Sequence, residues 1–179
     1  MVAINEEKLK SLIRSVPDFP KKGIVFRDIT TLLKDKVAFS ETIDYCADLY
    51  KSVGVDKVVG VESRGFIFGS PLACRLGCGF VPVRKPNKLP AEKVRCEYQL
   101  EYGTDALEMH SDAIAKGEKV LIVDDVLATG GTSEATTKLV KMLGGEIIGL
   151  VFIIELAFLH GRDRLKGYDV HSLISYSAE

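Results

Sequence analysis

Apolar residues near the start of the chain recur with the spacing of a helix. They are Leu9, Leu12, Ile13 and Val16. This spacing, with Asn5 as a cap, predicts a helix over residues 5–16 that Pro17 ends. A second apolar stripe predicts a helix from about residue 36 to residue 53, after an irregular segment that contains two prolines.

From residue 57 onward, short apolar runs alternate with polar loops and helical stretches. The runs are KVVGV (57–61), FVPV (80–83), VLIVDDV (120–126), EIIGLVFII (146–154) and VHSLISY (170–176). Helices are expected in GFIFGSPLACRL and over residues 132–143. This succession predicts a parallel α/β sheet with right-handed crossovers and helices on both faces. Pro82 favours an edge position for its strand.

Residues 86–113 interrupt the alternation with a polar, mixed stretch. Apolar side chains at every second position from Val94 to Leu100 predict a hairpin-like excursion. Tyr102 and Gly103 indicate a bend within it. The pattern fits an ordinary hairpin turn and a mobile lid equally well.

The composition is that of a globular protein and excludes several classes. The 179 residues are 46% hydrophobic and 27% charged, which argues against a disordered chain, a collagen or a coiled coil and favours one domain over residues 1–179. A net charge of −1 disfavours a general nucleic-acid partner. The longest apolar stretch, residues 147–159, contains Glu155 and is shorter than the ~20 residues of a membrane helix. No signal peptide and no C-x-x-C pair is found, so we expect a cytoplasmic protein without a membrane partner.

The segment VLIVDDVLATGGT carries the clearest chemistry. Asp124 and Asp125 fall at the carboxyl end of a strand, where ligands bind in open α/β sheets. Residues 128–132 then lead into a helix N-terminus, which favours an anion, and paired glycines let the backbone approach it. The local interpretation is a ribose 5-phosphate, with its hydroxyls on the acids and its phosphate on the loop. The alternatives are a generic loop and the magnesium-binding acid of a nucleotide hydrolase, but the G-x-x-x-x-G-K-[ST] motif of those hydrolases is missing.

Three further segments are weak signals when each is taken alone. Glu62-Ser63-Arg64-Gly65 follows a strand, and such an arginine is commonly a surface ion pair. A basic run within twelve residues fits a solvated face. Its members are Arg84, Lys85, Lys88, Lys93 and Arg95. Val25-Phe26-Arg27-Asp28 fits a short core strand.

Taken together, these segments resemble a known family. VLIVDDVLATGGT resembles the thirteen-residue signature of the type I phosphoribosyltransferases. PDFPKKGIVFRDIT, GVESRGFIFGSPLA, VPVRKPNKLP and LEYGTDALEMHSDAI resemble the adenine phosphoribosyltransferases in order and spacing, over about residues 15–155. The resemblance implies a parallel twisted sheet flanked by helices, with an N-terminal hood over residues 1–33 and a mobile lid loop over residues 86–110. It also implies purine salvage: transfer of the phosphoribosyl group of 5-phosphoribosyl 1-pyrophosphate (PRPP) to adenine, giving AMP and pyrophosphate.

The resemblance also implies a role for each segment. The ribose and 5′-phosphate of PRPP are expected on Asp124, Asp125, Ala128, Thr129, Gly130, Gly131 and Thr132. Pyrophosphate is expected on Glu62, Ser63, Arg64, Arg84, Lys85, Lys88 and Tyr102. Adenine is expected against Val25, Phe26, Arg27 and Leu156, and catalysis is expected from Glu101 and Arg64. Many members have aspartate where this chain has Glu62, and the family loop often holds a cis peptide, which we expect between Glu62 and Ser63.

The resemblance further implies a homodimer and Mg²⁺, which is held mainly by PRPP and water rather than by protein ligands. Two alternatives are an enzyme for another base, such as xanthine or hypoxanthine, and a PRPP- or purine-sensing regulator. Such regulators carry a DNA-binding domain, and the sixteen residues before Pro17 are too few for a winged helix.

Glu101 gives the first testable prediction. Adenine loses the proton of N9 as it attacks C1′, and a positioned general base accelerates such a transfer by about 10²–10⁴-fold. Glu101→Gln is therefore expected to lower kcat by that order and to leave PRPP affinity and melting temperature unchanged. A variant within threefold of the wild-type kcat, with chemistry shown to limit the rate, would remove Glu101 from the mechanism.

Overall fold

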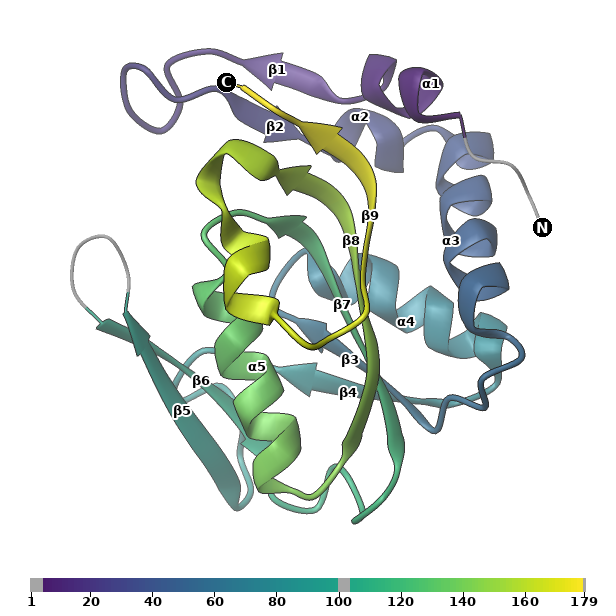
Figure 1. Cartoon of the computed structure of the whole chain (residues 1–179), viewed down its shortest axis with the longest axis vertical. Helices are drawn as coiled ribbons and strands as arrows, with labels where there is room; N and C mark the ends of the chain where they lie inside the picture. The colour runs from purple at the N-terminus through teal and green to yellow at the C-terminus, as the bar shows by residue number, and fades with distance from the viewer. Residues whose placement is uncertain (1–4, 100–103, 179) are drawn as a thin grey trace.

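A five-stranded parallel sheet forms the centre of the computed structural model, which describes residues 5–99 and 104–178 (Figure 1). Its strands are β3 (Lys57–Val61), β4 (Gly79–Val83), β7 (Lys119–Leu127), β8 (Glu146–Leu156) and β9 (Val170–Tyr176). They are ordered β4-β3-β7-β8-β9, and every neighbouring pair is parallel. The predicted fold class is confirmed. Pro82 lies on the edge strand β4, as predicted, because an edge strand tolerates a residue that cannot donate a backbone hydrogen bond.

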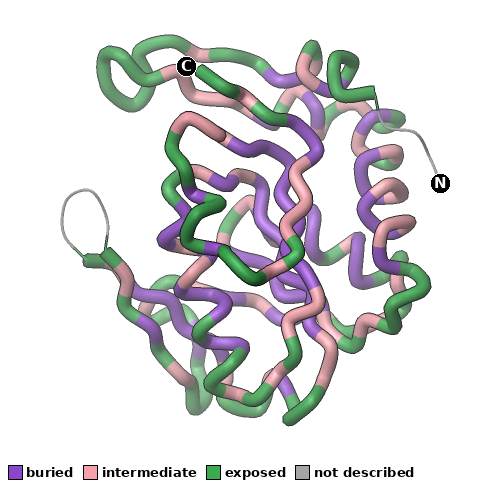
Figure 2. Tube along the Cα trace, viewed as in Figure 1, coloured by how far each residue is buried: buried purple, intermediate pink, exposed green. Residues whose placement is uncertain are grey.

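Helices cover one face of the sheet, and a helix with a hairpin covers the other. α3 (Lys36–Tyr50) and α4 (Gly65–Leu76) pack on the first face. α5 (Gly131–Met142) packs on the second, beside the antiparallel pair β5 (Lys93–Gln99) and β6 (Thr104–His110). Both faces of each central strand are therefore apolar. Figure 2 shows the buried residues, in purple, gathered in the middle of the molecule.

The strands divide their side chains between two cores by simple alternation. Leu121 and Val123 lie in the core beneath α3 and α4. Val120 and Ile122 lie in the core beneath α5. Successive side chains of a strand point to opposite faces, so an unbroken apolar run fills both cores at once.

The N-terminal helix is shorter than predicted. α1 spans Glu6–Ser11, and β1 (Arg14–Val16) then pairs antiparallel with β2 (Phe26–Asp28). The helical spacing ends early because a partner strand ten residues further on competes for the same backbone, and Arg14 donates to Asp28 across this pair at 3.0 Å. α2 (Thr30–Leu33) and the 3-10 turns η1 (Ala157–Leu159) and η2 (Gly161–Leu165) were not predicted.

The strand order leaves a crevice at the carboxyl ends of β3 and β7. The chain leaves β3 through α4 toward β4 on one side, and it leaves β7 through α5 toward β8 on the other. The loops that follow β3 and β7 therefore diverge, which is the point where open α/β sheets bind ligands. None of the helices within the described ranges is long and apolar enough to cross a membrane.

Candidate active site

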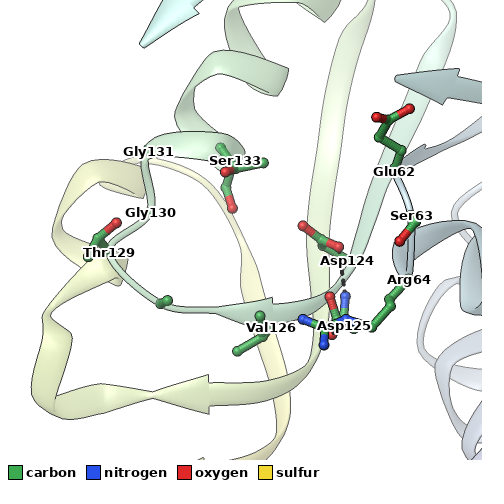
Figure 3. Close-up of a pocket in the computed structure, with 12 residues that line it drawn as sticks. Glu62, Ser63, Arg64, Asp124, Asp125, Val126, Thr129, Gly130, Gly131 and Ser133 are labelled. Atoms are coloured by element: carbon green, nitrogen blue, oxygen red, sulfur yellow. Dashed lines mark hydrogen bonds and ion pairs between the residues drawn. The ribbon is translucent and has the colours of Figure 1, made fainter. Parts of the chain in front are cut away.

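A cavity of about 380 Å³ lies at this crevice (Figure 3). It is lined by residues from the ends of β3 and β7 and from the start of α5. They are Glu62, Ser63, Arg64, Asp124, Asp125, Val126, Ala128, Thr129, Gly130, Gly131, Thr132 and Ser133. The fold thus brings the predicted 62–64 loop to the acids and the glycine loop, although about sixty residues of sequence separate them.

The glycine loop joins the end of β7 to the start of α5. Gly130 caps the helix with φ +81°, a left-handed conformation that favours glycine. The first N–H groups of α5 have no partner within the helix, and the helix dipole adds positive potential there. Thr129 and Thr132, which carry hydroxyl groups, also line the cavity. This arrangement suits a phosphate group.

Gly161, which was not predicted as part of the site, packs against the backbone of this loop. A Cβ at Gly161 would collide with the carbonyl oxygen of Ala128 and lie 2.9 Å from the Gly130 nitrogen. A Cβ at Gly130 would in turn collide with the Gly161 carbonyl. The two backbones are in direct contact, so neither position has space for a side chain. No periodic pattern marks Gly161 in the sequence.

The acid pair is buried at the end of β7. Asp124 is 8% exposed and Asp125 is 5% exposed. Burial raises the pKa of Asp124 well above its usual range, and the neighbouring charge of Asp125 raises it further. Burial also raises the pKa of Asp125, although the Arg64 guanidinium opposes this rise. The backbone N–H of Asp125 donates to Asp124 Oδ1 at 2.9 Å, which orients that carboxylate.

Arg64 connects the loop after β3 to the acids. Its Nε lies 2.7 Å from Asp125 Oδ2, and Figure 3 shows the Arg64 side chain extending to Asp125. Gly65, which follows it and begins α4, would place a Cβ 2.9 Å from Asp124 Oδ1, so its lack of a side chain leaves room for that carboxylate. The peptide between Glu62 and Ser63 is cis, which confirms the prediction made for it.

Basic residues gather beside the cavity without lining it. Arg84 Nε donates to Glu62 Oε2 at 2.7 Å, and Lys85 Nζ lies 3.0 Å from Asp105 Oδ2. The Arg84 Nη1 also donates to the Lys88 carbonyl at 3.4 Å, while the Lys88 side chain is exposed. Two of the predicted cations are thus held by carboxylates on the same side of the molecule as the 62–64 loop.

The residues predicted to meet a base are also absent from the cavity lining. Phe26 nevertheless contacts a residue that lines it: the Arg64 guanidinium carbon lies 5.3 Å from the centre of the Phe26 ring. Leu156 and Val126 are half-buried, and each packs against the core beneath α3 and α4. Val25 and Arg27 are half-buried in and before β2. Glu101 and Tyr102 lie outside the described residues.

Val126 and Ser133 line the cavity and were not predicted. Val126 follows the acid pair directly, and alternation along β7 could have indicated that it faces the same crevice. Ser133 lies in the first turn of α5 and is buried, one position beyond the segment to which the phosphate was assigned.

Comparison with known proteins gives consistent results. Residues 29–175 match the phosphoribosyl transferase domain family. A curated adenine phosphoribosyltransferase from Acidobacterium capsulatum is 61% identical, over 98% of this chain and 97% of that protein. The crystal structure of adenine phosphoribosyltransferase from Thermoanaerobacter pseudethanolicus is similar with a TM-score of 0.93 and 55% identity, covering 96% of this chain and all of that one. The Saccharomyces cerevisiae enzyme, solved with adenine and an imino-altritol bisphosphate, is similar with a TM-score of 0.89 and 41% identity, covering 94% and 97%.

The buried acid pair predicts a stability effect that depends on pH. Folding favours the protonated form of Asp124. Below the ordinary aspartate pKa the carboxyl is protonated in both the folded and the unfolded chain, so it costs no stability. As pH rises from there toward the raised pKa, the unfolded chain ionises more readily and the folded state is increasingly destabilised. Asp124→Asn is therefore expected to raise the melting temperature of the ligand-free protein at neutral pH, and to raise it less near about pH 4. Thermal unfolding across this range, with the exposed Asp163→Asn as control, measures the effect. A gain that is the same at every pH would contradict the prediction.

The contact behind the glycine loop predicts an effect from outside the cavity. Gly161→Ala places a methyl group against Ala128 and Gly130, and overpacking of this kind costs about 1–3 kcal/mol unless the backbone moves. We expect the loop to shift and PRPP to bind about tenfold more weakly or worse. Calorimetric titration with PRPP tests this, and Lys166→Ala is the control from the same region. Wild-type affinity in Gly161→Ala would show that the loop tolerates the displacement.

Proposed function

Because this chain belongs to the phosphoribosyltransferase family, and within it to the adenine phosphoribosyltransferases, we propose a division of labour among its residues for the reaction that it catalyses. That reaction is the salvage of adenine: PRPP and adenine give AMP and pyrophosphate. The observation that supports the division is the convergence of an arginine, two buried acids and a glycine loop on one cavity.

The acids and the glycine loop hold the phosphoribosyl group. The carboxylates of Asp124 and Asp125 accept hydrogen bonds from the two ribose hydroxyls, which are bonds to charged groups and therefore strong. The 5′-phosphate lies against residues 128–132, where the N–H groups of α5 and the hydroxyls of Thr129 and Thr132 donate to it. Sugar and phosphate thus occupy the β7 side of the cavity.

Pyrophosphate occupies the β3 side. Backbone N–H groups at Ser63 and at the start of α4 donate to it, and Arg64 adds a positive charge. Arg84 and Lys85, which carboxylates hold beside the cavity, add further charge with Lys88. The bond to C1′ breaks with negative charge developing on the leaving group, so cations fixed beforehand lower the barrier.

Adenine enters under the β1–β2 hairpin. Phe26 and Leu156 pack against the ring, and backbone groups of Val25 and Arg27 bond its edge. A backbone N–H and a backbone carbonyl distinguish a base that carries an amino group from one that carries an oxo group. The wrong base would leave a buried polar group unpaired, at a cost of about 1–3 kcal/mol. The reaction leaves an oxocarbenium-like ribose, so positioning of the two substrates supplies much of the acceleration. Glu101 takes the proton from N9, and Tyr102 contacts pyrophosphate from the same loop.

Magnesium fits this site as a companion of PRPP. Within the part of the chain that the structure describes, no three His, Cys, Asp or Glu side chains gather to hold a metal ion. Mg²⁺ commonly retains waters and uses one or two carboxylates plus substrate phosphates, and Glu62, Asp124 and Asp125 are the carboxylates that line the cavity. When bound, it would neutralise charge on pyrophosphate.

We also propose that residues 1–179 form one cytoplasmic domain that acts as a homodimer, with residues 1–33 as its hood and 86–110 as its lid.

Asp125→Asn tests the assignment of the ribose. Loss of a charged acceptor costs about 1.5–3 kcal/mol, so kcat/KM for PRPP should fall by roughly 10- to 150-fold while the fold persists. Steady-state kinetics with PRPP, magnesium and a panel of adenine, hypoxanthine and xanthine measure both this loss and the base preference. Asp163→Asn serves as a matched surface control. An unchanged kcat/KM for PRPP in Asp125→Asn would place the ribose elsewhere. Turnover of hypoxanthine equal to that of adenine would contradict the proposal that backbone groups of Val25 and Arg27 recognise the edge of adenine.

A further inference from the structure

The β1–β2 hairpin is too small to hold its own position. Each of its strands has three residues. A two-stranded hairpin of this size is marginal in water by itself, so its location over the cavity depends on what it packs against. Its open end, away from the turn, is attached to the core through Ile29 and Leu32, which are buried in the residues that follow β2.

The end of the last strand contacts this hairpin. The Arg27 guanidinium carbon lies 4.0 Å from the centre of the Tyr176 ring, which is the geometry of a cation–π interaction. The same guanidinium donates from Nη1 to Ser15 Oγ at 2.5 Å, so it joins both strands of the hairpin to β9. Figure 1 shows the end of β9 and the C-terminus alongside β2.

The first helix reinforces the same junction. Glu6 Oε1 accepts a hydrogen bond from the Ser175 backbone N–H at 3.0 Å. Lys10 Nζ lies 2.9 Å from Glu6 Oε1 and 5.8 Å from the centre of the Tyr176 ring. Tyr176 is half-buried between two cations, and burial raises the pKa of its hydroxyl in spite of them.

This junction connects to the cavity through adjacent residues. Phe26 precedes Arg27 in β2, and its ring faces Arg64 at 5.3 Å. Arg64 is in turn paired with the buried Asp125 at 2.7 Å. A displacement of the hairpin at Arg27 therefore moves the Phe26 ring relative to the cavity.

We propose that Tyr176 is a positioning residue for base binding. It holds Arg27, and with it the β1–β2 hairpin, over the side of the cavity where adenine enters, and it acts without contacting the base. This inference rests on the proposed adenine site at Val25, Phe26 and Arg27. It makes affinity for the base depend on a side chain three residues from the end of the chain.

Tyr176→Leu and Tyr176→Phe form the test. Leucine keeps apolar volume but removes the ring face, whereas phenylalanine keeps the ring face and removes only the hydroxyl. We expect Tyr176→Leu to raise KM for adenine about three- to tenfold, with kcat, KM for PRPP and melting temperature unchanged. Tyr176→Phe is expected to keep the wild-type KM for adenine.

Three results would overturn the proposal. They are an unchanged KM for adenine in Tyr176→Leu, a parallel loss of kcat, both KM values and melting temperature, and an effect of Tyr176→Phe as large as that of Tyr176→Leu. A double variant with Arg27→Met adds a second criterion: since both changes break one contact, Tyr176→Leu should have no further effect on KM for adenine in that background. Additive effects would count against the contact.

Phe26→Ala separates this inference from the function on which it rests. If Phe26→Ala raises KM for adenine while Tyr176→Leu does not, the adenine site stands and the role of Tyr176 is wrong. If Phe26→Ala leaves KM for adenine unchanged, the proposed adenine site itself is wrong.

Discussion

The burial of two adjacent carboxylates at the end of β7 is the constraint on which the site depends. Taking charged groups out of water is costly, and the raised pKa of both acids expresses that cost. The Asp125–Arg64 ion pair offsets part of it and holds the loop after β3 against β7. Asp125 would therefore exchange a protein partner for the ribose hydroxyls, and Arg64 would turn toward pyrophosphate when PRPP binds. A site for a sugar and an anion benefits from such a pair, because the acidic and the basic side chain neutralise each other's charge while the site is empty.

Close backbone packing is the second requirement. The phosphate loop contacts the turn at Gly161, and α4 begins at Gly65 beside Asp124, so side chains are missing where chain segments meet. Such contacts hold the N–H groups of α5 in place, so a phosphate that binds there as proposed would meet a smaller cost of ordering them. They also explain why the loop can present two glycines and remain well defined: its neighbours, and not its own side chains, restrict it.

The parallel sheet supplies the frame of the site. Sheet order puts the β3 and β7 loops side by side, whereas the groups assigned to the base come from a small hairpin at the N-terminus and from the end of β8. A recognition element that is marginal by itself needs anchors, and the contact of Arg27 with Tyr176 joins it to the last strand of the same sheet. If adenine binds as proposed, its recognition is linked to the C-terminal strand rather than to the loops assigned to PRPP.

The sequence by itself determined the features that depend on neighbours along the chain. Apolar runs identified all five sheet strands, the proline marked the edge strand, and the acids followed by a glycine loop indicated a sugar phosphate, because strand alternation and helix N-termini are local properties. Only the tertiary structure decided that residues 14–16 form a strand, that Arg64 pairs with Asp125, that Gly161 supports the phosphate loop and that Tyr176 meets Arg27. These contacts join segments from separate parts of the chain, and their partners are set by the order of the strands and the crossing of backbones, which no spacing in the sequence encodes.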